Sequence, residues 1–401
     1  MNPARARAFV IELGAALHRA GAPAHRLENA LTGVARRLGM EAQCFTTPTQ
    51  LMVAFGAIPE QQVVMLRVEP GEIDLAKLAA LDGLADAVVA GEVDVDEGLR
   101  HVQAIASAPK RYRGWAVVLA FGLTSAAVAR FFDGGLYELA TAGVIGLAIG
   151  VLSLVFTRSV AGTRVFELVA AFVAASAALG ATHAGVPGSF RITIIAALIV
   201  LIPGLTLTVA MTELATRNLV SGTTRLTAAA IVFLEIAFGV ALAEQVMTRW
   251  LGVAVGVPSA SLPVWTEPIA LLVAALSIAV LFHTHPRSLP GVVVACVAGF
   301  YGARLGAWLL GPQLGAGLGA FIIAAGANAY ARLADRPAMV PLIPGILLLV
   351  PGSLGFRSLS AMMERDVVTG IDTAFAMILV AVSLVAGLLI ANATISPRRE
   401  L

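Results

Sequence analysis

Two proline–glycine pairs inside long apolar runs are the first residues whose types and spacing suggest chemistry. Pro203-Gly204 and Pro351-Gly352 are separated by an offset of 148 residues. Proline removes a backbone donor and glycine tolerates unusual dihedral angles, so each pair should break a helix and free polar backbone groups. Freed amides attract a carboxylate and freed carbonyls attract a cation. The two breaks together would therefore suit a zwitterion such as an amino acid.

Hydroxyl side chains follow both breaks, at a depth where they would bind a small polar solute. The expected substrate-binding residues at the breaks are Pro203, Gly204, Thr206, Thr208, Pro351, Gly352 and Ser353. The alternative is that the prolines only kink their helices, while the hydroxyls bond back to the helix backbone. One copy alone would favour this alternative, whereas two matched copies favour a binding site.

Polar residues within apolar runs are costly in lipid and therefore indicate function. We expect Arg304 to counter a substrate carboxylate and Asn328 to contact substrate. Arg304 could equally reach the interface or pair with an acid, and Asn328 could join two helices. Glu235 is the first candidate for proton coupling, with Glu213 and Asp372 at run ends as further candidates. The alternatives are an interhelical hydrogen bond for Glu235 and a wetted interface for the other two.

No pattern for metal, cofactor or nucleic-acid chemistry is visible. Cys44 and Cys296 lie far apart and have no metal-ligand spacing, and His283 and His285 beside Arg287 are typical of a loop. No nucleotide-binding motif supports a primary pump. The expectation is a protein without catalytic residues, metal or cofactor, and without a nucleic-acid partner.

The composition of the chain indicates which kind of secondary-structure element positions these residues. The chain has 401 residues, of which 58% are hydrophobic and 13% charged, with a mean hydropathy of +0.88. Soluble domains carry about 25% charged residues. Apolar runs of about 20 residues predict membrane-spanning helices, and the 39 glycines suit close helix packing in lipid. The chain is therefore expected to be a polytopic membrane protein.

Residues 1–108 hold much of the charge and predict a small α+β cytoplasmic domain. Apolar residues recur at helical spacing over 9–17 and 27–38, and they alternate with period two over 51–55 and 64–68. Asp74 and Asp94 are the expected N-caps of two further helices. Charges interrupt the first 25 positions, so no cleavable signal peptide is expected.

Ten apolar runs follow this domain. They cover roughly 115–131, 137–156, 165–184, 192–212, 224–246, 267–284, 289–309, 313–331, 338–356 and 372–394. Adding 148 to the first five approximates the last five, which predicts two five-helix repeats over residues 109–248 and 249–401. Five is an odd number, so the second repeat would be inverted in the membrane.

The distribution of positive charge predicts the orientation. With residues 1–108 inside, twelve lysines and arginines near the spans lie inside and five lie outside, which favours both termini in the cytoplasm. The expected fold is an all-α polytopic membrane protein of ten transmembrane helices, as two inverted five-helix repeats with Pro-Gly broken helices. That pattern is typical of an alternating-access transporter.

The whole chain resembles the bacterial threonine/serine exporter family. The N-terminal resemblance rests on residues 21–28 (GAPAHRLE) and 45–49 (FTTPT), and continues through 78–84, 88–99 and 112–115 (YRGW). The more specific C-terminal match is residues 344–356 (PGILLLVPGSLGF). Gln50 departs from the small residue expected after the Thr-Pro-Thr motif, which weakens any role for that loop.

The resemblance implies proton-driven export of small hydroxylated amino acids, L-threonine and L-serine, across the bacterial cytoplasmic (inner) membrane. Its partners would be the substrate, protons and lipid, and a homo-oligomer is compatible with it. Relatives that handle small dicarboxylates such as succinate make this the alternative substrate class.

Two other classes of protein remain open alternatives. A membrane-tethered enzyme would use His25, Glu28, Cys44 and Thr47 to Thr49 within residues 1–108, but no phosphate loop or nucleophile elbow accompanies them. A channel would also be compatible with inverted repeats, and movement of solute against a gradient would exclude it. The N-terminal domain is expected to be a gate, a vestibule or an assembly module.

Overall fold

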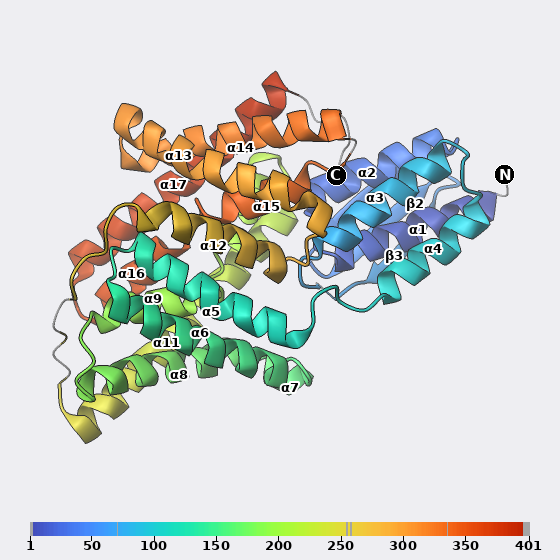
Figure 1. The fold of residues 1–401 in the computed structure, drawn as a ribbon. Helices are drawn as coiled ribbons and strands as arrows, with labels where there is room; N and C mark the ends of the chain where they lie inside the picture. Colours follow the sequence, from blue (N-terminus) through green and yellow to red (C-terminus); the bar gives the residue numbers. More distant parts are fainter. Residues whose placement is uncertain (1–2, 70, 254–255, 257–258, 335, 396–401) are drawn as a thin grey trace.

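The computed structural model describes residues 3–69, 71–253, 256, 259–334 and 336–395. Figure 1 shows two parts along one long direction of the molecule. Helices α1 to α4 and three strands lie at one end, and the helices from α5 onward form the rest. The arrangement places a small mixed domain against one face of a helical membrane body.

The N-terminal part contains four helices and one sheet. Its elements are α1 (Pro3–Arg19), α2 (Ala24–Arg37), β1 (Ala42–Thr47), β2 (Gln50–Phe55), β3 (Gln62–Arg67), α3 (Leu75–Val89) and α4 (Val95–Ser107). The strands are antiparallel in the order β1-β2-β3. Asp74 accepts a hydrogen bond from the Lys77 amide at 2.9 Å and Asp94 from the Asp96 amide at 3.1 Å. Both expected N-caps are thereby confirmed.

The core of this part is built by the apolar residues that recur at helical and strand spacing. Phe9, Leu13 and Leu17 of α1 are fully buried, as are Leu27 and Leu31 of α2. They pack with apolar residues of β2 and α3 in one continuous cluster. The predicted strands at β2 and β3 are confirmed, whereas β1 was not predicted because its residues lack apolar alternation.

The membrane part begins at α5. Its first half contains α5 (Gly114–Phe131), α6 (Leu136–Phe156), α7 (Val160–Thr163), α8 (Phe166–His183), α9 (Phe190–Leu198), α10 (Gly204–Ala215) and α11 (Leu219–Leu251). Its second half contains α12 (Thr266–Leu281), η1 (Pro286–Ser288), α13 (Leu289–Leu310), α14 (Pro312–Ala334), α15 (Met339–Leu347), α16 (Gly352–Met363) and α17 (Val367–Thr394).

Among the described residues, eight helical segments are long and apolar enough to cross a membrane. Two shorter apolar helices, Gly204–Ala215 and Thr266–Leu281, accompany them. The chain is therefore a helical, multi-pass membrane protein. The helix over the sixth predicted run ends at Leu281, shortly before His283 adopts a left-handed backbone with a φ of 50°.

Both proline–glycine pairs interrupt a helical segment. Helix α9 ends at Leu198 and α10 begins at Gly204, while α15 ends at Leu347 and α16 begins at Gly352. Each break thus separates a helix of 9 residues from one of 12 residues. Pro203 and Pro351 precede the second helices with similar dihedral angles, φ −78° and −79°, ψ 42° and 29°.

Backbone geometry after the breaks also recurs at the same offset. Arg217 and Arg365, which are 148 residues apart, both adopt a φ of 67° in the left-handed region. Such a conformation is uncommon for residues other than glycine, so its recurrence at matched positions is informative. In each half it joins a 12-residue helix to the long helix that follows, α11 or α17.

Candidate functional site

The two helix breaks meet in the middle of the membrane part. A Cβ atom placed on Gly204 would lie 3.3 Å from the Cα of Gly352 and would collide with Val350. A Cβ atom placed on Gly352 would lie 3.2 Å from the Cα of Gly204 and 2.6 Å from Ile202. Ile202 and Val350 occupy matched positions two residues before each glycine. The contact is reciprocal, as expected for segments related by an approximate two-fold axis.

The hydroxyl groups after the breaks are mostly engaged with backbone carbonyls. Thr208 donates to the Gly204 carbonyl at 3.2 Å, and Thr212 donates to the Thr208 carbonyl at 2.8 Å. Ser358 donates to the Gly370 carbonyl at 2.7 Å. Thr206 and Ser353 are half-buried. Back-bonded hydroxyls remain acceptors, so they can still receive a hydrogen bond from a solute.

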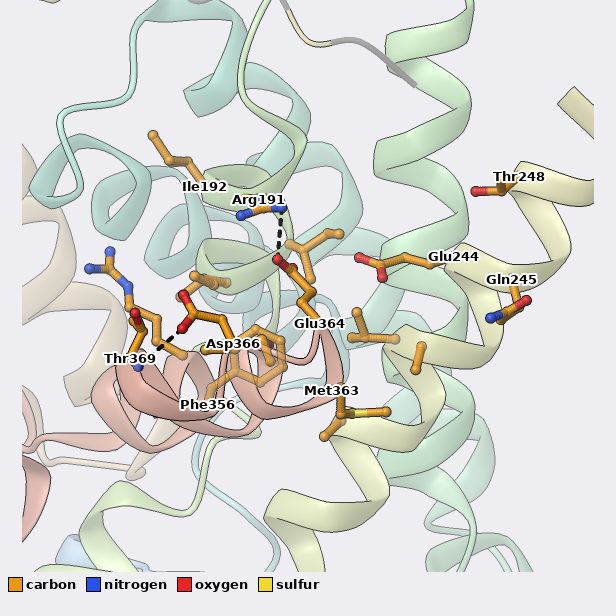
Figure 2. Close-up of a pocket in the computed structure, with 18 residues that line it drawn as sticks. Arg191, Ile192, Glu244, Gln245, Thr248, Phe356, Met363, Glu364, Asp366 and Thr369 are labelled. Carbon is orange, nitrogen blue, oxygen red and sulfur yellow. Dashed lines mark hydrogen bonds and ion pairs between the residues drawn. The ribbon is translucent and has the colours of Figure 1, made fainter. Parts of the chain in front are cut away.

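A cavity of about 680 Å³ opens at the end of the molecule that lies away from the N-terminal part, and we term it the distal cavity. Its walls come from α9, α11 and α16, with the start of α17. Arg191 pairs with Glu364 across it at 3.0 Å, as Figure 2 shows. Glu244 extends from α11 toward this pair in the same view.

The distal cavity also contains an exposed guanidinium group. Arg357 of α16 lies over the ring of Phe132, with its Cζ atom 4.9 Å from the ring centroid. Asp366 is occupied as the N-cap of α17, where it accepts from the Thr369 amide at 3.2 Å. Arg357 and Glu244 thus place a cationic and an anionic group in one solvent-accessible space.

A smaller cavity, of about 90 Å³, lies at the end that faces the N-terminal part, and we term it the proximal cavity. Its membrane walls come from α10, α15 and α17, with Ala324 of α14. Pro23, His25 and Arg26 complete the lining from the N-terminal part. Thr208, Thr212 and Thr216 line it at intervals of four residues, so they share one face of α10.

The two cavities have corresponding walls. Ten of the thirteen membrane-helix residues that line the proximal cavity have their counterpart, at an offset of 148, in the lining of the distal cavity. The pairs are Arg191 with Met339, Ile194 with Leu342, Ile195 with Ile343, Thr208 with Phe356, Val209 with Arg357, Thr212 with Ser360, Thr216 with Glu364, Val240 with Leu388, Ala241 with Leu389, and Glu244 with Asn392. Both halves line each cavity: α9, α11 and α16 line the distal cavity, and their counterparts α15, α17 and α10 line the proximal cavity.

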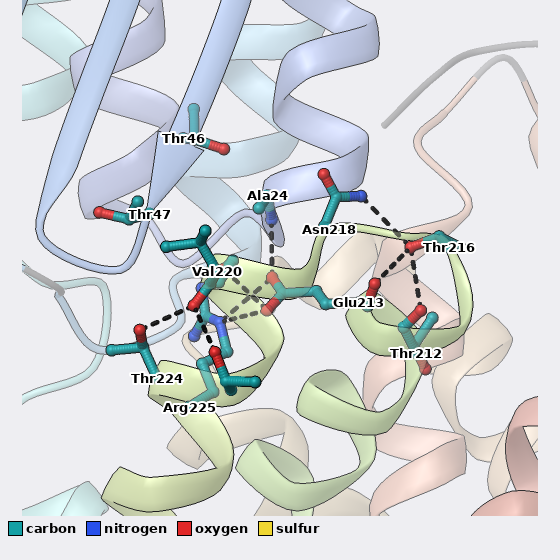
Figure 3. A network of polar contacts seen from close by, with 12 residues as sticks. Ala24, Thr46, Thr47, Thr212, Glu213, Thr216, Asn218, Val220, Thr224 and Arg225 are labelled. Carbon is teal, nitrogen blue, oxygen red and sulfur yellow. Dashed lines mark hydrogen bonds and ion pairs between the residues drawn. The ribbon is translucent and has the colours of Figure 1, made fainter.

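Glu213 lies at the contact between the membrane part and the N-terminal part. Its side chain is fully buried, and its Oε1 atom accepts from the Ala24 amide at 3.0 Å. Its Oε2 atom accepts from the Ser221 hydroxyl at 2.8 Å and from Arg225 Nε at 3.1 Å (Figure 3). Burial of a carboxylate requires such partners. Glu213 therefore joins α2, α10 and α11 at one point.

Two histidines of the N-terminal part lie near this contact. The Nδ1 atoms of His18 and His25 are buried without a hydrogen-bond partner in the described part of the chain. Burial lowers the pKa of His25 to about 3, and the positive charges of Arg26 and Arg225 add to this shift. Burial also lowers the pKa of His18, whose Nε2 atom lies 2.8 Å from the Thr47 carbonyl oxygen.

Arg304 and Asn328 line neither cavity, although Asn328 contacts Asn392 of the proximal cavity lining. Arg304 pairs with Glu267 at 2.8 Å, and its side chain is 57% exposed. Asn328 is buried and donates to the Asn392 side chain at 3.0 Å and to the Ile395 carbonyl at 2.7 Å, which joins α14 to α17.

Of the acids proposed for proton coupling, Glu213 is the one whose hydrogen bonds join separate elements within the described part of the chain. Glu235 is half-buried on α11, within electrostatic reach of Glu167 on α8. Asp372 is exposed on α17. Within the described ranges, no group of three histidine, cysteine or acidic residues is arranged to hold a metal ion.

The pair Arg191–Glu364 and the facing groups Glu244 and Arg357 were not among the candidates chosen from the sequence. Arg191, Glu244 and Arg357 lie near the ends of apolar runs and Glu364 lies between two runs, where a charged residue is ordinarily solvated at the membrane interface. The offset of 148 could have located two of them, because it relates Glu364 to Thr216 and Glu244 to Asn392.

Comparison with family models agrees with the resemblance read from the motifs. Residues 8–247 match the family model described as "Putative threonine/serine exporter". Residues 267–394 match the model described as "Threonine/Serine exporter, ThrE". Together the two matches cover the N-terminal part and both membrane halves. No solved structure matches the chain.

The curated relatives include fungal proteins that are named as membrane proteins. The chain is 27% identical over 363 residues to pheromone-regulated membrane protein 10 of Debaryomyces hansenii, covering 87% of this chain and 36% of the relative. The protein of the same name from Candida albicans is 28% identical over 380 residues, covering 91% and 34%. That from Eremothecium gossypii is 27% identical over 364 residues, covering 87% and 48%.

The chain thus spans about a third to a half of the length of these relatives. The family models cover most of the chain, and their extent agrees with a helical membrane body preceded by a mixed domain. This protein belongs to the threonine/serine exporter family.

Proposed function

We propose that this protein is a secondary active exporter of small hydroxylated amino acids, L-threonine and L-serine, driven by the proton gradient. Membership of an exporter family supports transport rather than enzymatic chemistry. The proposed site of action is a bacterial cytoplasmic membrane, with both termini in the cytoplasm. Small dicarboxylates such as succinate are the second candidate substrates, because Arg191 and Arg357 both line the distal cavity.

The correspondence between the two cavities is the observation that carries this proposal. Two cavities with matched walls lie on opposite sides of the contact between Gly204 and Gly352. A transporter that alternates between two faces needs two such routes, of which one is open at a time. Their volumes, about 680 Å³ and about 90 Å³, correspond to a state that is open at the distal end.

We further propose that the membrane part consists of ten spans in two inverted five-helix repeats. The matched bounds of α10 and α16, the recurring backbone at Arg217 and Arg365, and the reciprocal glycine contact support a two-fold relation. The short helices α10 and α12, added to the eight longer segments, would then give ten spans. In this scheme residues 1–108 form a domain of their own, followed by repeats over 109–248 and 249–401.

The substrate would bind near the crossed breaks and leave through the distal cavity. Pro203, Gly204, Pro351 and Gly352 would provide polar backbone groups there, with hydroxyls of α10 and α16 as additional acceptors. Opposite charges in the distal cavity, Arg357 and Glu244, would suit the carboxylate and ammonium groups of an amino acid as it leaves. Glu235 is the first of the proposed coupling acids in this scheme, followed by Glu213 and Asp372.

Threonine efflux from cells loaded with a threonine-containing dipeptide tests the proposal. Expression of the protein should accelerate efflux, and an uncoupler should abolish the acceleration. Succinate efflux, measured in parallel, addresses the second candidate. If verified surface expression changes neither threonine nor serine efflux, the proposal for hydroxylated amino acids is wrong. Efflux that is unaffected by the uncoupler would contradict proton coupling.

A further inference from the structure

The N-terminal part closes the mouth of the proximal cavity. Pro23, His25 and Arg26, at the start of α2, form one side of its lining. The opposite side is formed by Thr212 and Thr216 near the end of α10. The first turn of α2 therefore lies between the proximal cavity and the rest of the N-terminal part.

A buried carboxylate of α10 contacts this turn directly. Glu213, one residue after Thr212, accepts the amide hydrogen of Ala24, the first residue of α2. The first amides of a helix have no partner within the helix, and the positive end of the helix dipole favours an anion there. Arg225 binds both oxygens of the same carboxylate, at 3.2 and 3.1 Å. The Glu213 carboxylate thus accepts hydrogen bonds from the N-terminal part, through Ala24, and from the membrane part, through Arg225.

The matched positions at the distal end lack these groups. At an offset of 148, Glu213 corresponds to Ala361 and Arg225 to Thr373. Ala361 lines the distal cavity, which is several times larger, and no element of the N-terminal part appears among the residues that line it. Glu213 and Arg225 therefore lie at the end that the N-terminal domain contacts, and the matched positions of the other half do not carry these charged groups.

We propose that the N-terminal domain is the gate of the proximal cavity and that Glu213 is its latch. Helix α10 begins at the Gly204 break and carries Glu213 near its other end. Any movement of α10 about the break must either carry α2 with it or break the bond between Glu213 and Ala24. The gate is thereby connected to the helix breaks. This role goes beyond transport itself and does not depend on the identity of the substrate.

Thiol labelling of the full chain in lipid nanodiscs tests the gate, with a small maleimide present on both faces. In a Cys44→Ser, Cys296→Ala background, Thr212→Cys reports on the proximal cavity. Ser360→Cys, at the matched position, reports on the distal cavity. Two latch variants are compared with this parent: Glu213→Ala, and Glu213→Ala with Arg225→Thr. The double variant copies the residues found at the distal end and leaves no guanidinium without its carboxylate.

Both latch variants should label Thr212→Cys about tenfold faster or more, because a hydrogen bond to a charged group contributes about this much to an equilibrium. Labelling of Ser360→Cys should not accelerate in parallel, because the contacts that the latch variants remove lie at the proximal end of α10. An unchanged Thr212→Cys rate would overturn the proposal. Equal acceleration at both positions would also overturn it, since that result indicates general loosening. The assay needs no substrate, so its outcome is separate from that of the efflux experiment.

Discussion

Single side chains at the contact between α2 and α10 join the N-terminal part to the membrane part, and the proposed gate depends on them. Glu213 satisfies both carboxylate oxygens with donors from the α2 backbone, Ser221 and Arg225. A neutral Glu213 could no longer form an ion pair with Arg225. The ion pair with Arg225 is therefore part of the latch, and the same residue is among the acids proposed for proton coupling.

The His25 imidazole should make the gate sensitive to pH. Burial first, and then Arg26 and Arg225, lower its pKa to about 3 in the docked domain, whereas its ordinary value is 6.5. As the pH falls below 6.5, the undocked state binds a proton and the docked state does not. Undocking is then favoured, by about tenfold at pH 5.5 relative to pH 7.5. Thr212→Cys labelling should accelerate over this range.

The matched variant for this prediction is His25→Gln, which keeps a polar side chain but does not titrate. It should flatten the dependence of Thr212→Cys labelling on pH. Glu28 acts in the opposite direction, because burial raises its pKa and proton uptake then favours the docked state. Burial also lowers the pKa of His18, which acts in the same direction as His25. The comparison isolates His25, since His18 and Glu28 are present in both proteins. An identical pH profile in His25→Gln would contradict the assignment.

At the scale of helices and strands, sequence patterns predicted the elements whose signal is local. The two breaks follow from proline and glycine chemistry, and the caps of α3 and α4 follow from Asp74 and Asp94. Strand β1 was missed because pairing with β2, rather than its own residue pattern, holds it in the sheet. The engagement of Thr208 with the Gly204 carbonyl was left open by the sequence, because spacing cannot distinguish a free hydroxyl from a back-bonded one.

The crossing of the two breaks should tolerate no added side-chain volume. Gly204→Ala would place a methyl group against Val350 and 3.3 Å from the Gly352 Cα atom. We expect a loss of about 1–3 kcal/mol in stability, because overpacking forces neighbouring atoms apart. The thermal midpoint of the purified protein in detergent measures this loss. Gly352→Ala should behave in the same way.

Gly326→Ala is the control for the glycine substitutions. Gly326 lies within α14, and a Cβ atom there would have no neighbour within 4 Å. Alanine has a higher helix propensity than glycine, by up to about 1 kcal/mol. This variant should therefore keep or raise the thermal midpoint. Equal midpoints for Gly204→Ala and Gly326→Ala would show that the breaks are not closely packed.

For the whole molecule, the repeat offset could be read from the sequence, but the state of the two cavities could not. The offset pairs Thr212 with Ser360 and Asn392 with Glu244. It does not indicate which residue of each pair lines the larger cavity. That depends on how the halves pack and on the domain that covers one end. Arg191 and Glu364 illustrate the same limit, because they come from α9 and α16 and meet only in the folded protein.

Alternating access makes a prediction that separates this protein from a channel. In the Glu213→Ala, Arg225→Thr background the domain no longer masks the proximal cavity, so labelling of Thr212→Cys and Ser360→Cys reports the membrane helices directly. Saturating threonine should then change the two rates in opposite directions, because closing one cavity accompanies opening of the other. A pore through the crossed breaks would expose both positions at once. Parallel changes at the two positions would therefore favour the channel over the exporter.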